Sequence, residues 1–180
     1  MFSRIYTFFI DKTNKKIVFA GLGLILIFNL VLFPLVPRFA GMSFSPGWVL
    51  DLKFGFQTSY VYRLMNFLGD EGRRAYLYFT LFVDMPYLII YAFTYAFLIA
   101  YVLKKKSLNQ KFQFLLLFPF IIALFDLLEN AGIVYLLLHP YDFNEKYVVF
   151  ISFFNQMKWI LAALTFAGFL GILFIPAKKK

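Results

Sequence analysis

The stretch FQFLLLFPFIIALFDLLENAGIVYLLL, from Phe112 to Leu138, decides the fold of this chain. It is longer than the run of about 20 apolar residues that a helix needs to cross a bilayer. The run nevertheless carries Asp126, Glu129 and Asn130 in its interior. Charged side chains cost free energy in hydrocarbon unless they have partners, so they usually mark a binding site, a pathway or an obligatory contact between helices.

Three similar apolar stretches surround this one. They predict membrane helices at about residues 17–36, 74–103 and 147–175, beside the one at 112–138. The composition agrees, because 62% of the residues are hydrophobic and only 15% are charged, whereas soluble domains are nearer half apolar. We therefore expect an all-α fold: one domain over residues 1–180 that forms a polytopic bundle of four transmembrane helices.

The basic residues indicate the orientation. Eleven Lys and Arg lie in the N-terminal segment, in the loop between the second and third spans and in the tail, against six in the other connecting segments. By the positive-inside rule both termini face the cytoplasm, and we expect the membrane to be the bacterial cytoplasmic membrane. Because the basic residues stand in short runs at segment ends, we interpret the formal charge of +9 as topology signals and lipid-headgroup contacts, and expect no nucleic-acid partner.

The sizeable extramembrane piece is then the outer loop, residues 37–73. Thr58 or Ser59 is a suitable N-cap for a short amphipathic helix, and Gly69 is suited to end it. The preceding stretch, Phe44–Phe56, is rich in aromatic residues and turn formers. Two interpretations stay open for this loop: a connector that lies along the membrane surface, or a lid over the mouth of the bundle.

Polar side chains from several spans fall at one depth. At 1.5 Å per residue, each lies roughly 14 to 18 Å below the outer boundary. Spacings of three and four residues place the polar residues of the third span on one stripe, and those of the fourth span on another. Because lipid-facing stripes would be costly, we expect both to turn inward. The predicted cluster, with two aromatic residues along its walls, comprises Asp84, Asp126, Glu129, Asn130, Asn155, Lys158, Tyr87 and Trp159.

The charge of this cluster is not balanced. Asp84, Asp126 and Glu129 bring three carboxyls, whereas Lys158 brings a single ammonium. A low-dielectric interior resists an excess of negative charge. We therefore expect at least one carboxyl to be protonated, or a cation or cationic ligand to complete the balance.

Several kinds of chemistry are excluded by missing residues. The chain has no Cys, which removes thiol catalysis, iron–sulfur clusters and thiolate zinc sites. Its one histidine, His139, cannot form a di-histidine metal motif or a bis-histidine haem site within one chain. No glycine-rich phosphate loop or nucleophile elbow occurs in the sequence. We therefore expect neither a metal nor a cofactor.

The pattern favours a buried pocket in the outer half of the bilayer that binds a small amphipathic or lipid-like molecule; whether the chain is an enzyme stays open. One alternative is a structural or assembly subunit, in a homo-oligomer or with a partner membrane subunit, whose buried charges fix helix packing. Another is a proton- or ion-coupled transporter or channel formed by an oligomer. A third is an intramembrane isomerase in which a carboxyl moves a proton and Lys158 stabilises charge.

Four motifs stand out: FLGDEGRRAY at Phe67–Tyr76, Asp84-x-Pro86-Tyr87, FDLLENAG at Phe125–Gly132, and Lys158-Trp159. Together, over about residues 50–165, they resemble a family of small bacterial four-span integral membrane proteins to which no reaction is assigned. The arrangement is also similar, in style only, to sterol-isomerase-like membrane domains, whose histidine and glutamate motif has no counterpart here. The first resemblance implies that the family pattern includes Gly72, Arg73, Tyr76, Asp84, Pro86, Asp126, Glu129, Asn130 and Lys158.

Overall fold

The computed structural model describes residues 2–35, 49–108 and 110–176, and every regular element in those ranges is a helix. Within them, four helical stretches are long and apolar enough to cross a membrane: Lys15–Leu35, Thr58–Lys105, Phe112–Leu138 and Glu145–Phe174. The predicted all-α bundle of four membrane-type helices is therefore confirmed. In chain order the elements are α1 (Phe2–Lys12), α2 (Lys15–Ile27), η1 (Phe28–Leu32), α4 (Thr58–Phe79), η3 (Thr80–Asp84), α5 (Met85–Lys105), η4 (Gln110–Leu117), α6 (Phe118–Leu138) and α7 (Glu145–Phe174).

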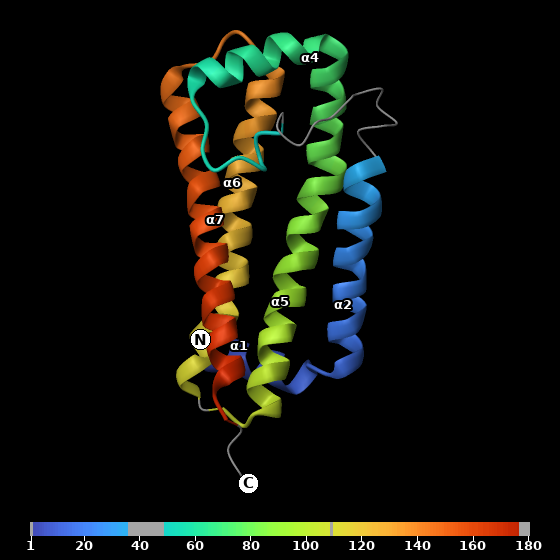
Figure 1. The fold of residues 1–180 in the computed structure, drawn as a ribbon, viewed down its shortest axis with the longest axis vertical. Helices are drawn as coiled ribbons and strands as arrows, with labels where there is room; N and C mark the ends of the chain where they lie inside the picture. Colours follow the sequence, from blue (N-terminus) through green and yellow to red (C-terminus); the bar gives the residue numbers. More distant parts are fainter. Residues whose placement is uncertain (1, 36–48, 109, 177–180) are drawn as a thin grey trace.

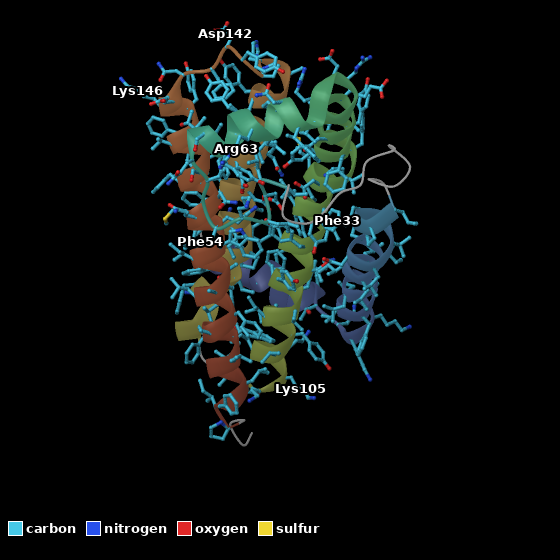
Figure 2. All side chains as sticks on the ribbon, turned by 45° about the horizontal axis from the view of Figure 1, so that its top comes forward. Phe33, Phe54, Arg63, Lys105, Asp142 and Lys146 are labelled. Carbon is cyan, nitrogen blue, oxygen red and sulfur yellow. The ribbon has the colours of Figure 1, made fainter. Side chains whose placement is uncertain are left out.

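The long helices α2, α5, α6 and α7 run side by side along the molecule (Figure 1). The first part of α4 lies across one end of this bundle, and α1 lies at the other end (Figure 1). α5 packs against both α2 and α6, while α6 has its most extensive contact with α7. Charged residues mark the two ends, with Lys105 at one and Asp142 and Lys146 at the other (Figure 2).

Helix α4 changes direction at Gly69, which adopts φ 60° and ψ −172°, a conformation that side chains rarely adopt. The half before the kink buries three apolar residues, Val61, Leu64 and Met65, in the core at that end of the bundle, as its amphipathic spacing predicts. The predicted end of the short helix therefore corresponds to the kink. The predicted N-cap is wrong: the cap is Gln57, which makes no side-chain capping hydrogen bond, and Thr58 and Ser59 already lie inside the helix.

The second membrane-type stretch is irregular where it carries Asp84. Residues Thr80–Asp84 form a π-helical turn, and Pro86 is the second residue of the helix α5 that follows it. Proline has no N–H group to donate, and its ring crowds the carbonyl four residues earlier, so the α-helical hydrogen-bond pattern is interrupted there. A second π-helical turn, Phe28–Leu32, carries Asn29 on the neighbouring helix.

Two glycines let neighbouring helices approach closely. A Cβ atom at Gly132 on α6 would collide with the side chain of Ile151 on α7. A Cβ atom at Gly21 on α2 would lie 2.5 Å from Thr94 Oγ1 on α5. The pairs α6–α7 and α2–α5 are therefore held at short distance, which fixes how their polar faces are turned.

The loop before α4 enters the end of the bundle (Figure 1). Leu50 is fully buried, and its N–H donates a hydrogen bond of 3.1 Å to the hydroxyl of Tyr76. Gly55 adopts φ 76°, which lets the chain turn sharply inside the bundle. Of the predicted lid, residues 49–56 thus form an insertion between the helices, and residues 44–48 lie outside the described residues.

The N-terminal segment, whose basic residues were interpreted only as topology signals, forms helix α1. Its Phe9 is buried with its ring centroid 4.9 Å from that of Phe97 on α5. Thr13 Oγ1 donates to the Phe97 carbonyl over 3.0 Å, and Lys104 Nζ donates to the Ile10 carbonyl over 2.8 Å. α1 is therefore bound to the end of the bundle at which α7 also ends (Figure 1).

Candidate functional site

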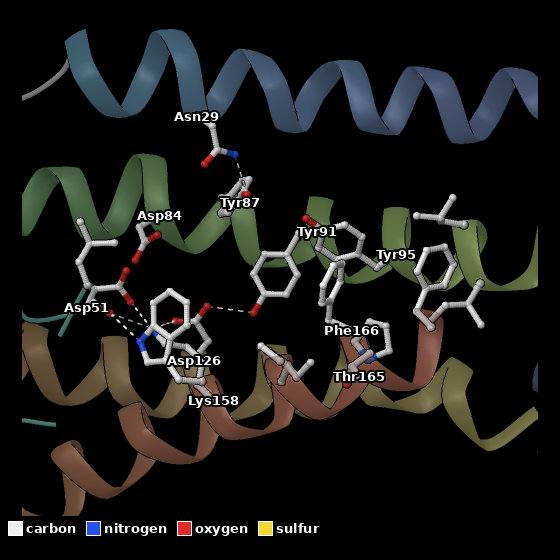
Figure 3. Close-up of a pocket in the computed structure, with 18 of the residues that line it drawn as sticks. Asn29, Asp51, Asp84, Tyr87, Tyr91, Tyr95, Asp126, Lys158, Thr165 and Phe166 are labelled. Carbon is white, nitrogen blue, oxygen red and sulfur yellow. Dashed lines mark hydrogen bonds and ion pairs between the residues drawn. The ribbon is translucent and has the colours of Figure 1, made fainter. Parts of the chain in front are cut away.

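A cavity of about 510 Å³ lies between α5, α6 and α7. Its polar and apolar side chains are separated along the length of the helices (Figure 3). The ionisable residues gather at the end nearer the inserted loop: Asp51, Asp84, Asp126 and Lys158. The part nearer α1 is lined mainly by apolar residues: Leu98, Ile99, Ile122, Ala162, Phe166 and Phe169.

Lys158, from α7, is the centre of the polar end and is only 6% exposed. Its Nζ lies 2.7 Å from Glu129 Oε2 and 3.2 Å from Asp126 Oδ1, and it also pairs with the Asp51 carboxylate. The Glu129 contact is an ion pair by distance, although Oε2 accepts no aligned hydrogen bond. A buried ammonium without a partner costs free energy, and the ion pairs with these carboxylates offset that cost.

Asn155 ties the inserted loop to Glu129. Its Nδ2 donates to Glu129 Oε1 over 2.8 Å and to the Asp51 carbonyl over 3.2 Å. Its Oδ1 accepts the N–H of Gly55 over 2.7 Å. Ser152, one turn earlier on α7, accepts a further N–H of the loop over 2.8 Å. The loop is therefore fastened to α7 by its backbone, which positions the Asp51 carboxylate over Lys158.

Asp84 occupies the α5 side of the polar end and is 7% exposed. Its Oδ2 accepts a hydrogen bond of 2.7 Å from Asn130 Nδ2. Among the residues that the structure describes, no basic group forms an ion pair with Asp84. Asn130 is itself buried, and its Oδ1 has no hydrogen-bond partner within the described ranges.

Three tyrosines of α5 line one wall of the cavity. Their spacing of four residues places them on one face of the helix, with ring centroids 5.4 Å apart for Tyr87 and Tyr91 and 6.2 Å apart for Tyr91 and Tyr95. The Tyr91 hydroxyl donates to Asp126 Oδ2 over 2.9 Å (Figure 3). The Tyr87 hydroxyl accepts from Asn29 Nδ2 over 2.8 Å, which connects this wall to η1.

The cavity is open along its side. Tyr95, Trp159 and Phe166 line it and are nevertheless 39%, 39% and 63% exposed. All three belong to stretches that are long and apolar enough to cross a membrane. When these helices span a bilayer, the opening faces acyl chains rather than water.

The structure separates the predicted site residues into two sets. The residues that line the cavity are Asp84, Tyr87, Asp126, Lys158 and Trp159. The residues that do not line it, but contact those that do or the inserted loop, are Glu129, Asn130 and Asn155. All six predicted polar side chains are buried.

Two residues of the site were not predicted, Asp51 and Tyr91. Asp51 stands in the predicted outer loop, where its charge is typical of an exposed surface, and only its aromatic-rich surroundings indicate burial. Tyr91 follows Tyr87 by four residues, and this spacing is the signal that places both rings on one helix face.

The polar end contains more acid than base. Asp51 adds a fourth carboxyl to the three predicted, against the single ammonium of Lys158. One carboxylate oxygen from each of Asp51, Asp84 and Asp126 lies within 4.8 Å of the other two. Like charges at such distances repel strongly in a medium of low dielectric constant, so the arrangement needs a proton or a further positive charge.

No protein-family model, curated protein or solved structure matches this chain. The family resemblance of the four motifs therefore stays a prediction, and the function is argued from the site.

Proposed function

We propose that this chain binds a small amphipathic or lipid-like molecule in the cavity between α5 and α7. The polar head of the molecule contacts the end formed by Asp84, Asp126 and Lys158, and its apolar part extends toward Phe166 and Phe169. The observation that carries this proposal is a cavity of about 510 Å³ whose carboxyl and ammonium groups all lie at one end. Small-molecule sites have volumes of roughly 300 to 1,000 Å³ and pair an apolar lining with a few placed polar groups.

The side opening supports entry from the bilayer. A lipid-soluble molecule can reach Trp159 and Phe166 from between the acyl chains, without passing the loop that carries Asp51. Its apolar part exchanges one hydrocarbon environment for another and so gains little free energy. The contacts of the head with the polar end therefore decide which molecules bind.

We also propose the bacterial cytoplasmic membrane as the location, with both termini in the cytoplasm, membrane lipids as the immediate partners and no nucleic acid. The distribution of Lys and Arg supports this orientation. The chain has no Cys, so single cysteines introduced at Lys12 and at Lys146 test it. An impermeant maleimide should label the first only in inverted vesicles and the second only in intact cells.

Filling the apolar part of the cavity tests the binding proposal. Ala162 lines the cavity, whereas the adjacent Ala163 is exposed on the outside of α7 and gives a matched control. A dodecanol that carries a diazirine in its chain serves as the probe in lipid nanodiscs. Ala162→Phe should lower photolabelling of α5 and α7 by about tenfold, since overfilling a packed site costs about 1 to 3 kcal/mol. Ala163→Phe should leave it unchanged, and equal labelling of the two variants contradicts the proposal.

A second candidate, a structural or assembly subunit in a homo-oligomer or with a partner chain, is supported by the three carboxylates around Lys158. A combined variant separates the two: Lys158→Met, Asp51→Asn, Asp126→Asn and Glu129→Gln remove the ammonium together with all three carboxylates that pair with it, so no member is left unpaired. If this variant inserts and folds but loses photolabelling, the subunit function is excluded. If it separates from partner chains and keeps photolabelling, the binding function is excluded.

A further inference from the structure

The two sides of the polar end differ in what their carboxylates contact. Asp126 meets Lys158 Nζ at 3.2 Å and the Tyr91 hydroxyl at 2.9 Å. Asp84, which also lines the cavity, receives a hydrogen bond from the neutral amide of Asn130 and, within the described ranges, no ion pair. The side of the cavity along α5 therefore offers a buried carboxylate without a cationic partner.

A second acceptor lies beside Asp84. The Oδ1 of Asn130 belongs to the amide whose Nδ2 donates to Asp84 Oδ2, and Asn130 is only 1% exposed. This Oδ1 has no hydrogen-bond partner among the described residues. A buried acceptor without a partner costs free energy comparable to a lost hydrogen bond, so the amide that holds Asp84 is itself incompletely satisfied.

The oxygens are also close enough to share one donor group. One carboxylate oxygen each of Asp51, Asp84 and Asp126 lies within 4.8 Å of the other two, and all three residues line the cavity. An ammonium group has up to three N–H donors, and charged donors form the strongest hydrogen bonds with carboxylates.

Resting on the proposed function, we infer that the ligand is a cationic amphiphile, a molecule with a protonated amine head and an apolar tail. The amine binds between Asp84, Asp51 and Asp126, and the tail follows the apolar lining toward Phe166. The amine supplies the cationic partner that Asp84 lacks among the described residues and reduces the excess of negative charge.

A carboxylate or phosphate head fits the same end poorly, because it would add negative charge beside four carboxyls. A divalent metal ion fits the oxygens but not the cavity: a hard cation takes about six oxygen ligands and leaves the apolar part without an occupant. An amine with an apolar tail fits both the acidic end of the cavity and its apolar part.

Three photoreactive probes of equal chain length test the inference on the unmodified chain: dodecylamine, dodecanol and dodecanoate, each with the diazirine at the same carbon. The protein is held in phosphatidylcholine nanodiscs at neutral pH, and labelling is followed against the mole fraction of probe in lipid. The amine should reach half-saturation at a mole fraction about tenfold to hundredfold lower than the alcohol, since a hydrogen bond to a charged group is worth roughly 1.5 to 3 kcal/mol.

The outcomes separate the inference from the function it rests on. Labelling that Ala162→Phe reduces, but that is as strong for the alcohol or carboxylate as for the amine, overturns the cationic head and leaves the binding proposal standing. Absence of any labelling sensitive to Ala162→Phe overturns both.

Substitution identifies the anchor. Asp84→Asn keeps the shape of the side chain and should abolish the preference for the amine, whereas Glu71→Gln removes the same charge from an exposed position on α4 and should not change it. A preference that survives Asp84→Asn contradicts the assignment of Asp84.

A competition experiment tests the alternative of a metal site. Calcium chloride is compared with choline chloride at equal ionic strength, and displacement of the amine by calcium alone would mark a metal site and overturn the inference.

Discussion

The α7 side and the α5 side of the polar end both carry buried charged residues, but within the described ranges only those on the α7 side form ion pairs. On the α7 side, Lys158 lies against Asp51, Asp126 and Glu129. On the α5 side, Asp84 has only the amide of Asn130 as a described partner. Both sides are buried to a similar degree, with Lys158 6% and Asp84 7% exposed.

Burial alone therefore does not distinguish a structural charge from one kept for a ligand. The ammonium of Lys158 is held by contacts that exist without any ligand, which is typical of a group that fixes helix packing. Asp84 is held less completely and faces the cavity. The comparison predicts that substitutions on the α7 side mainly change stability, whereas substitution of Asp84 mainly changes binding.

The largest effect is expected from Lys158→Met. The substitution leaves Asp51, Asp126 and Glu129 without their common cation, and an uncompensated buried charge costs about 3 to 5 kcal/mol. The temperature of thermal unfolding in detergent should be strongly lowered in this variant. Lys146→Met, at an exposed position on the same helix, is the control and should unfold like the parent. Equal unfolding temperatures for the two variants would remove the structural role of Lys158.

A smaller effect is expected from Asn155→Ala. It deprives the loop of its bond at Gly55 and leaves Glu129 Oε1 without its donor, which costs about 1 to 3 kcal/mol. The loop should also become more accessible, so a single cysteine in place of the half-buried Val49 should react faster with maleimide. Ser152→Ala removes one backbone contact and should give an intermediate rate; an unchanged rate in both variants would show that these bonds do not hold the loop.

A still smaller change is expected from Tyr91→Phe. The variant loses only the hydrogen bond to Asp126, and such a bond contributes roughly 1 kcal/mol. Tyr95→Phe, one turn further along the same cavity wall, removes a hydroxyl from a 39% exposed residue and serves as the matched comparison. The two unfolding temperatures should differ, with the Tyr91 variant the lower; the reverse order is inconsistent with the observed contact.

The smallest change in stability is expected from Asp84→Asn. Because Asp84 has no described ion pair to lose, the free energy of unfolding of the variant should stay within about 1 kcal/mol of that of the parent. Asp126→Asn, which loses contacts with both Lys158 and Tyr91, should unfold at a clearly lower temperature. If Asp84→Asn were the more destabilising of the two, the two sides of the polar end would not differ as described.

The long apolar helices were predictable, because the thickness of a bilayer and the rise of a helix fix the length of apolar chain that a span needs. That Asp126 and Lys158 face each other was also predictable, because the spacing of polar residues on each of their two helices forms a stripe that has to turn away from lipid. The insertion of Asp51 was not predictable, since a loop enters a bundle through contacts such as that of Gly55 with Asn155, which leave no period in the sequence.

The separation of lining residues from supporting ones also escaped sequence reasoning. Glu129 and Asp126 lie three residues apart on one stripe, yet only Asp126 lines the cavity. Residues three apart differ by about 60° in direction around the helix axis, so they face different neighbours. The close approach of α6 and α7 at Gly132 sets how α6 is turned, and thereby which of the two carboxyls lines the cavity. Helix α1 was missed because its basic residues were interpreted as topology signals alone.

The π-helical turn at Thr80–Asp84 changes the direction in which the side chains of one continuous helical stretch point. It contains one residue more than an α-helical turn, so the segments before and after it are rotated relative to one another by about 100° compared with a continuous α-helix. Tyr76 on one side thus reaches the inserted loop while Tyr87 on the other reaches the cavity. Removing a single residue such as Val83 would turn one of these two faces toward lipid, and the length of this turn therefore constrains the chain more tightly than the identity of its apolar side chains.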